Sequence, residues 1–215
     1  MDVKAAPGPA EELSSEEFQR IYGPIQPLEP RGAAELFRGA PLRWWVAGGW
    51  SLELDDEPRR EHEDLEVAIA RDDLPAVRDW LRDYHLWDIH EGALTFLKPG
   101  NDPPDEQHEQ LWLRRDAFSP WILDLLLTPV TADTWFYKRD RRLTRPIESV
   151  IRVGVDGVPY QQPEISLLFK ARRRAPRDEQ DFAAVVPQLD DAARAWLKEA
   201  IAMTEPPVNP WLDLL

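Results

Sequence analysis

The feature that most constrains the fold is the apolar run Trp44-Trp45-Val46-Ala47, which ends in the glycine pair Gly48-Gly49. The run predicts a buried strand, and the glycine pair predicts a tight turn after it. The residues from Trp50 to Leu54 can begin a helix. A strand, a glycine turn and a helix N-terminus together form a place where backbone N–H groups can hold phosphate.

Three carboxylates accompany this turn. Asp64-Leu65-Glu66 opens a second apolar run that extends to Ala70. Residues two apart in a strand point to the same face, so we expect Asp64 and Glu66 to project together. Asp124 interrupts the otherwise apolar strand from Trp121 to Leu127. A buried charge is costly unless it is paired or holds a cation, the alternative being an Asp on the polar side of a half-exposed strand. This set near a phosphate-holding turn is the minimal chemistry for a magnesium–nucleotide site.

Composition excludes several classes of site. The net charge of −14 argues against a broad nucleic-acid surface, and we expect no DNA partner. An acidic surface favours a cationic second substrate, or it serves only to keep the protein soluble. The chain has no cysteine, and its four histidines lack the helical spacing of a zinc site. No apolar stretch approaches the ~20 residues of a membrane span, so we expect a cytoplasmic protein without a membrane partner.

The order of the elements indicates an α/β (α+β) fold. Strands dominate the first 155 residues, and helices dominate the last 50. We therefore expect an N-terminal extension with helices in residues 1–40, a sheet domain in residues 41–160, and a helical part with a tail in residues 161–215. Within these parts the sequence predicts a capping box at Ser14, a hairpin around Glu91-Gly92, a helix from Asp72 or Asp73 to Asp83, and an extended tail whose Trp211 docks on the body.

The densest basic run of the chain comprises Lys170, Arg172, Arg173, Arg174 and Arg177. It is either a phosphate-facing patch or a solvated helix end. Residues four apart share a helix face, so Lys170 and Arg174 lie together while Arg172 turns away. We expect Lys170 to face the site. Asp178 and Asp181 are expected to pair with the arginines and to have no catalytic role.

Two segments resemble the signature of the nucleotidyltransferase superfamily, and the branch they resemble is the aminoglycoside 2''-adenylyltransferase-like proteins. The segments are residues 48–54 and residues 60–68. The resemblance continues through the Asp124 strand, the helix from Pro163 to Arg172, and the closing Pro210-Trp211-Leu212. It therefore spans roughly residues 42–215.

The resemblance implies a mixed β-sheet flanked by helices, with a helical C-terminal part. It also implies roles for the motif residues. Gly48 and Gly49 would contact the triphosphate of a nucleotide, and Lys170 would reach its phosphates. Asp64 would be the first metal ligand and Glu66 the second.

For the remaining motif residues, Asp124 matches the third carboxylate, which is the expected base for the acceptor hydroxyl. Arg60 and His62 belong to the nucleotide-binding motif and would order the loop before Asp64. The alternative for these two is an ion pair with Glu61 or Glu63 and a packed surface histidine.

Two residues depart from the family pattern. Glu66 stands where the best-characterised members carry Asp, and Glu53 replaces another frequent Asp. The resemblance implies a Mg²⁺-dependent enzyme that transfers a nucleoside monophosphate from a nucleoside triphosphate, expected to be ATP, to a hydroxyl of a small cationic acceptor such as an aminoglycoside. Two alternatives to this enzyme remain. The departures support a non-catalytic nucleotide-binding protein with a degenerate site. The second alternative is a toxin-like nucleotidyltransferase that acts on a macromolecule, and the charge of −14 weighs against RNA as its target.

Overall fold

The structure is a computed structural model, and it describes residues 14–53, 60–103, 105–205 and 208–215. The first 13 residues of the predicted N-terminal extension and Leu54 of the glycine motif lie outside these ranges.

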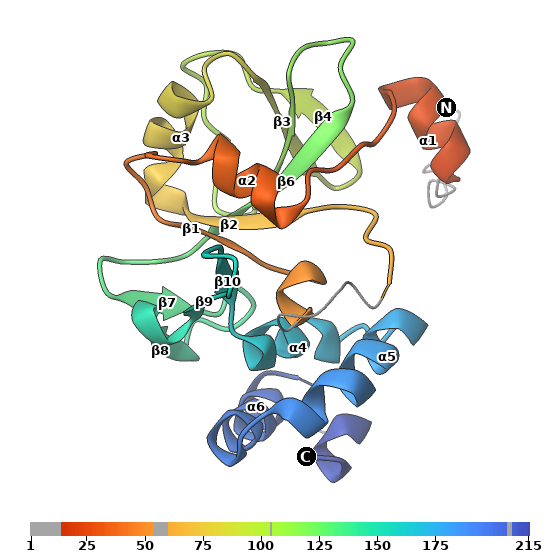
Figure 1. Cartoon of the computed structure of the whole chain (residues 1–215), viewed down its shortest axis with the longest axis vertical. Helices are drawn as coiled ribbons and strands as arrows, with labels where there is room; N and C mark the ends of the chain where they lie inside the picture. Colours follow the sequence, from red (N-terminus) through yellow and green to blue (C-terminus); the bar gives the residue numbers. More distant parts are fainter. Residues whose placement is uncertain (1–13, 54–59, 104, 206–207) are drawn as a thin grey trace, which may run out of the picture.

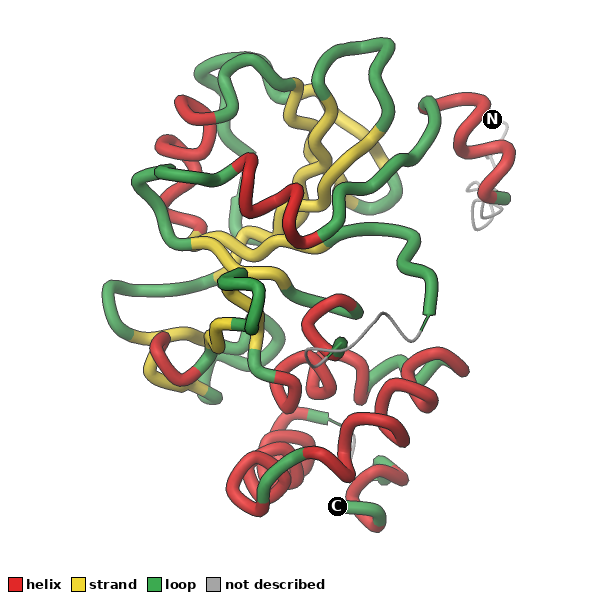
Figure 2. The backbone as a smooth tube through the Cα atoms, viewed as in Figure 1, coloured by secondary structure: helices red, strands yellow, loops and turns green. Residues whose placement is uncertain are grey.

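An eight-stranded mixed sheet forms the centre of the fold, with the strand order β4-β3-β5-β6-β2-β1-β10-β9 (Figures 1 and 2). The pairs β2–β6 and β1–β10 are parallel, and the other neighbours are antiparallel. A second sheet consists of β7 and β8. The strands are β1 (Trp44–Val46), β2 (Glu66–Ala70), β3 (His85–His90), β4 (Ala93–Phe96), β5 (Gln110–Arg114), β6 (Trp121–Thr128), β7 (Thr134–Phe136), β8 (Thr144–Pro146), β9 (Ile151–Val153) and β10 (Pro159–Gln161).

The described residues form six α-helices, of which the last three follow the sheet in sequence and lie together at one end of the molecule (Figure 1). Together with the mixed sheet, they confirm the predicted fold class. The helices are α1 (Ser15–Tyr22), α2 (Pro30–Leu36), α3 (Leu74–Trp80), α4 (Pro163–Ala171), α5 (Pro176–Val185) and α6 (Asp191–Thr204). Short 3-10 helices are η1 (Trp50–Leu52), η2 (Arg71–Asp73), η3 (Ile147–Ser149), η4 (Val186–Gln188) and η5 (Pro210–Asp213).

Strand alternation divides the apolar side chains of β2 between two cores. Val67 and Ile69 belong to the core under α2 and α3, whereas Ala68 belongs to the core shared with α4, α5 and α6. Successive side chains of a strand point to opposite faces, so Glu66 shares the face of Ala68. The same alternation on β6 places Asp124 on the face of Leu126, which packs against the core of the C-terminal helices. Both carboxylates therefore face the C-terminal helices.

Local sequence signals predicted several elements. Ser14 and Glu17 form the capping box of α1. The hairpin between β3 and β4 turns at Glu91 and Gly92, whose φ angles of 48° and 78° are left-handed. None of the helices in the described part of the chain combines the length and apolarity that a membrane span requires.

Three expectations need correction. The helix predicted after the glycine turn is only η1, because Glu53 leaves the helical conformation with a ψ of 86°. The helix predicted from Asp72 or Asp73 to Asp83 is shorter, because α3 ends at Trp80. The side chain of Trp80 is partly exposed, at 38%, and its indole N–H donates to the carbonyl of Leu36. The tail is not extended where it is described: Asn209 caps η5 by accepting from the backbone N–H of Trp211.

Trp211 docks on the body as predicted, and its burial generates a stability prediction. The side chain is fully buried, stacks on Phe182 at 4.1 Å between ring centroids, and donates its indole N–H to Glu179 at 2.9 Å.

Removing a buried Trp costs about 3–5 kcal/mol because a cavity remains. We expect Trp211→Ala to lower the free energy of unfolding by that amount in urea denaturation. The matched control, Leu214→Ala, truncates a side chain that is 65% exposed and should change it by less than about 0.5 kcal/mol. Equal losses in the two variants would contradict the docking.

Candidate active site

A cavity of about 370 Å³ opens between the sheet and helix α4. It is lined by seven of the eight residues that the sequence singled out, and only His62 lies outside the lining. The seven are Gly48, Gly49, Arg60, Asp64, Glu66, Asp124 and Lys170. The structure thus brings the predicted site residues together, whereas their individual roles stay predictions.

The glycine turn is shaped by close approach on both of its residues. Gly48 has a φ of +58°, and a Cβ atom at this position would overlap the carboxylate of Glu66. Only glycine adopts such a conformation readily and leaves room for that carboxylate. A Cβ atom on Gly49 would crowd the guanidinium of Arg60 and the ring of His62, at 2.5 and 2.9 Å. Residues 60–66 therefore lie directly against the turn.

A buried chain of hydrogen bonds holds the turn from behind, and the sequence analysis missed it. Trp45 donates its indole N–H to Gln161 at 3.3 Å, and the Gln161 amide donates to the Ser166 hydroxyl at 2.8 Å. The hydroxyls of Ser166 and Ser51 lie 2.6 Å apart, and Ser51 donates to the carbonyl of Gly48 at 2.8 Å. The chain joins positions up to 116 residues apart. The sequence hints at it only through Ser166, a hydroxyl within an apolar helix.

Glu66 and Asp124 lie opposite each other in the parallel pair of β2 and β6. Gln110 of β5 donates its side-chain amide to Oδ2 of Asp124, while Oδ1 is buried and has no hydrogen-bond partner among the described residues. The reading of Asp124 as a residue on a polar, half-exposed face is wrong, because its side chain is only 5% exposed.

Burial and neighbouring negative charge raise the pKa values of both carboxylates. Burial, followed by the charge of Asp64, raises the pKa of Glu66 to about 7. Burial, followed by the charge of Glu66, raises the pKa of Asp124 well above its ordinary value. Asp64 precedes β2 and is exposed at the rim of the cavity. Within the described ranges, no three Asp, Glu or His side chains are gathered closely enough to hold a metal ion in this arrangement.

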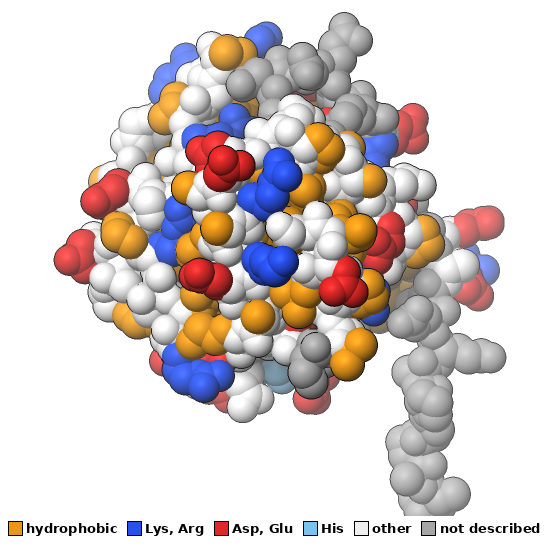
Figure 3. Space-filling view, turned by 90° about the horizontal axis from the view of Figure 1, so that it is seen from below, with side chains coloured by type: hydrophobic (Ala, Val, Ile, Leu, Met, Phe, Trp, Pro, Cys, Tyr) orange, Lys and Arg blue, Asp and Glu red, His pale blue; other side chains and the backbone are white. Residues whose placement is uncertain are grey.

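Cationic side chains outnumber carboxylates in the cavity, although the chain carries a charge of −14. Four carboxylates belong to the described lining: Glu63, Asp64, Glu66 and Asp124. Its cationic side chains are Arg60, Lys138, Arg139, Lys170, Arg173 and Arg177. On the outer face seen from below in Figure 3, by contrast, acidic and basic side chains are interspersed among apolar ones. The local excess of positive charge suits an anionic ligand.

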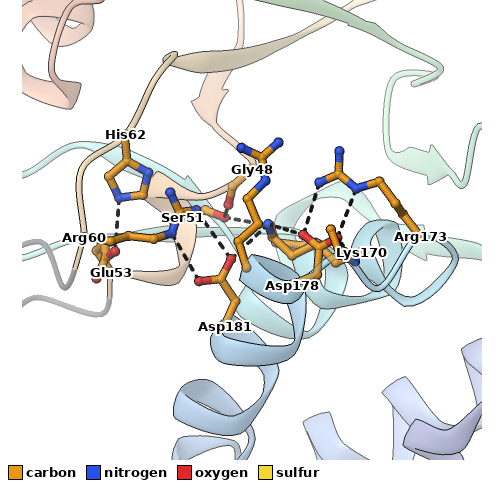
Figure 4. A network of polar contacts seen from close by, with 12 residues as sticks. Gly48, Ser51, Glu53, Arg60, His62, Lys170, Arg173, Asp178 and Asp181 are labelled. Carbon is orange, nitrogen blue, oxygen red and sulfur yellow. Dashed lines mark hydrogen bonds and ion pairs between the residues drawn. The ribbon is translucent and has the colours of Figure 1, made fainter.

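Four of these cations were not predicted as site residues. Arg173 and Arg177 belong to the basic run from which only Lys170 was chosen, and Lys138 and Arg139 come from the loop after β7. Lys170 lies between two carboxylates, at 3.1 Å from Asp178 and 2.9 Å from Asp181 (Figure 4). The expected pairing of Asp178 with an arginine is confirmed at Arg173.

Arg60 and His62 are held in a way that neither prediction described. Arg60 pairs with Asp181 at 3.4 Å rather than with a neighbouring glutamate, and it also donates to the backbone carbonyl of Glu61 (Figure 4). His62 is not a surface histidine, because its side chain is only 2% exposed and its ring stacks on Trp50 at 4.2 Å. Burial, followed by the charge of Arg60, lowers the pKa of His62.

The departure from the family pattern at Glu53 lies outside the cavity lining. Its carboxylate is 3.0 Å from Nε2 of His62, and the residue is 8% exposed. Glu66, the other departure, lies inside the cavity. Only the second departure therefore changes the chemistry of the site directly.

Comparisons with known proteins agree with the motif. The family model of aminoglycoside-2''-adenylyltransferase matches residues 31–91, which include the glycine turn, Asp64 and Glu66. No curated protein sequence matches the chain.

Two solved structures of the antibiotic-resistance factor ANT(2'')-Ia are distantly similar to this chain. The solution structure has 10% identity and a TM-score of 0.46, covering 80% of this chain and 86% of the other. The crystal structure in complex with adenylyl-2''-tobramycin has 8% identity and a TM-score of 0.40, covering 86% of this chain and 89% of the other. Because both TM-scores are below 0.5, the assignment depends on the match at residues 31–91. That match confirms the family resemblance: over residues 31–91 this chain is similar to the aminoglycoside-2''-adenylyltransferases.

Proposed function

We propose that this protein is a Mg²⁺-dependent nucleotidyltransferase that transfers a nucleoside monophosphate from a nucleoside triphosphate to a hydroxyl of a small cationic acceptor. One observation carries the proposal: a single cavity combines the half-buried Glu66 and the buried Asp124 with an excess of cationic side chains. Two carboxylates without a cationic partner among the described residues can bind a divalent cation, and the excess of cationic side chains can bind the phosphates of a nucleotide.

The residues of the cavity fit a magnesium ion. Mg²⁺ prefers oxygen ligands from one or two carboxylates together with substrate phosphates. Glu66 and Asp124 supply such oxygens, and Oδ1 of Asp124 is buried without a partner among the described residues. Asp64 at the rim is the further carboxylate, and its side chain would have to turn inward to join them. A bound magnesium ion would neutralise negative charge on the phosphates of the nucleotide.

The cations of α4 and of the adjoining residues would bind the triphosphate. Lys170 and Arg173 line the cavity from α4 and the turn after it, and Arg177 comes from the start of α5. Backbone N–H groups of the turn at Gly48 and Gly49, which line the same cavity, would also face the phosphates. The triphosphate would thus contact both the glycine turn and the basic run.

Asp124 is assigned the role of base. The acceptor hydroxyl attacks the α-phosphorus, its proton passes to Asp124, and the bond to the bridging oxygen of the β-phosphate breaks, so that pyrophosphate leaves. Gln110 donates to Oδ2 of Asp124 and thereby fixes the orientation of the carboxylate that takes the proton. Burial and the charge of Glu66 raise the pKa of Asp124, so this carboxylate takes up a proton more readily than an exposed Asp would.

A cationic acceptor, with an aminoglycoside as the leading candidate, is the finer part of the proposal. The family whose model matches residues 31–91 is named for adenylyl transfer to aminoglycosides. The net charge of −14 would attract a polycationic acceptor over long distances. ATP is the expected nucleotide for the same family reason.

A transfer assay tests the proposal. The protein is incubated with Mg²⁺, with each of ATP, GTP, CTP and UTP labelled at the α-phosphate, and with a panel of aminoglycosides and neutral sugars. We expect labelled acceptor and released pyrophosphate, and Asp124→Asn should lower turnover by at least about 100-fold because the base is lost. Glu199→Gln, an exposed change on α6, is the control and should leave turnover unchanged. Triphosphate binding without any transfer would instead identify a non-catalytic nucleotide-binding protein.

The pKa of Glu66 generates a prediction for the metal-free protein. The folded state raises this pKa from 4.5 to about 7, so the folded protein binds more protons than the unfolded chain between these values. The contribution of Glu66 to stability is therefore complete below pH 4.5 and is lost as the pH rises through 7, with a slope of up to about 1.4 kcal/mol per pH unit.

Urea denaturation of the wild type and of Glu66→Gln at pH 5, 6, 7 and 8 measures this loss. The wild type should lose stability relative to the variant as the pH rises, and saturating Mg²⁺ should reduce the loss because the ion replaces the proton. Parallel stability curves for the two proteins would contradict the prediction.

A further inference from the structure

Three of the cavity's cations are held by two carboxylates that do not themselves line it. Lys170 contacts Asp178 and Asp181, Arg173 contacts Asp178, and Arg60 contacts Asp181. Neither aspartate belongs to the described lining of the cavity. Both come from α5, so a helix behind the cavity supplies the counter-charges for the phosphate-facing side chains.

Asp181 is the carboxylate that joins two parts of the chain. Its Oδ2 lies 2.9 Å from the ammonium of Lys170 on α4 and 3.4 Å from Nη2 of Arg60, and its Oδ1 lies 3.4 Å from Nε of Arg60. The side chain is only 7% exposed, so these contacts are largely shielded from solvent (Figure 4). One carboxylate therefore connects the segment before β2 with the helix that carries Lys170.

These contacts leave Lys170 able to bind a further anion. An ammonium group has three N–H donors, and Asp178 and Asp181 accept from two of them. The third donor remains for a ligand in the cavity, which Lys170 lines. Without Asp181, the carboxylate of Glu66, which lines the same cavity, would be available to accept from the released donor. A Lys170–Glu66 ion pair would occupy both the phosphate-binding group and a proposed metal ligand.

Asp181 also fixes the position of Arg60. The Nη2 atom of Arg60 lies so close to Gly49 that a Cβ atom there would be 2.5 Å from it. A long side chain keeps such a position only where a partner restricts its rotation, because free rotamers are entropically favoured. Asp181 is the carboxylate that pairs with Arg60 here.

We propose that Asp181 is a positioning residue, which holds Lys170 and Arg60 beside the glycine turn in an arrangement that accepts phosphate. The inference rests on the proposed function, because it assumes that the ligand of this wall is a nucleoside triphosphate. The sequence analysis expected Asp181 to pair with arginines of the basic run, whereas its partners in the structure are Lys170 and Arg60.

Calorimetric titration with Mg²⁺ and ATP, without an acceptor, tests the proposal. We expect Asp181→Asn to weaken ATP binding by about tenfold, which corresponds to about 1.4 kcal/mol, whereas Glu199→Gln leaves it unchanged. If Asp181 acts through Lys170, the losses caused by Asp181→Asn and Lys170→Met should not add in the double variant. Unchanged or tighter binding by Asp181→Asn, or additive losses in the double variant, would overturn the proposal.

A second measurement makes the test independent of the nucleotide. Acylation of Lys170 by an amine-reactive ester, followed by peptide mass spectrometry, should become several-fold faster in Asp181→Asn, because the ammonium loses a partner that protects it. Equal rates in the two proteins would overturn the positioning role. Failure of the wild type to bind any triphosphate would instead overturn the proposed function, and the acylation rates would still decide the role of Asp181. If Asp181→Asn does not fold, Asp181→Ser serves in both measurements.

Discussion

The site depends on the parallel register that places Glu66 opposite Asp124. Two carboxylates that face each other at the centre of a sheet repel one another and lose hydration, and neither effect is offset by a hydrogen-bond partner for Oδ1 of Asp124 among the described residues. Proteins keep such an arrangement where a proton or a cation supplies the missing charge. The surrounding structure, from the glycine at position 48 to the amide of Gln110, accommodates these two side chains.

Charge separation is the second principle of the site. The cavity holds both signs of charge, yet three of its cations pair with Asp178 and Asp181, which lie outside its described lining. In the proposed arrangement, the two aspartates keep Lys170 from pairing with Glu66, a pairing that would neutralise the site internally. A polyphosphate with its divalent cation complements such a cavity, since it brings charges of both signs in a fixed relation. Electrostatic preorganisation of this kind costs no rearrangement when the ligand arrives.

The sequence predicted the features of the site that local pattern encodes. Period-two alternation and a break in an apolar run identified Glu66 and Asp124, and glycine punctuation identified the turn at Gly48. Local pattern also gave the hairpin at Glu91-Gly92 and the capping box of α1. It overestimated the helix after the turn, because nothing in the residues from Trp50 onward signals that Glu53 leaves the helical conformation.

The features that the sequence did not predict arise from docking of distant segments. The partners of Lys170 and Arg60 lie on α5, and Arg60 is separated from Asp181 by 121 residues. Lys138 could be predicted as a lining residue of the cavity only from the position of the loop after β7, which no sequence periodicity encodes. Asp181 was expected to pair with arginines of the basic run, because a helical pattern shows which residues share a face but not which segment covers that face.

The hydrogen-bond chain behind the glycine turn has a consequence for the behaviour of the protein across the pH range. An indole N–H can only donate and a carbonyl oxygen can only accept, so the chain from Trp45 to Gly48 has a single possible direction. Its members are an indole, a carboxamide, two hydroxyls and a backbone carbonyl, none of which gains or loses a proton under physiological conditions. The frame that carries the turn is therefore indifferent to acidity, while Glu66, which lies against that turn, titrates near neutrality. Acidification would change the charge inside the cavity without changing the hydrogen bonds of this frame.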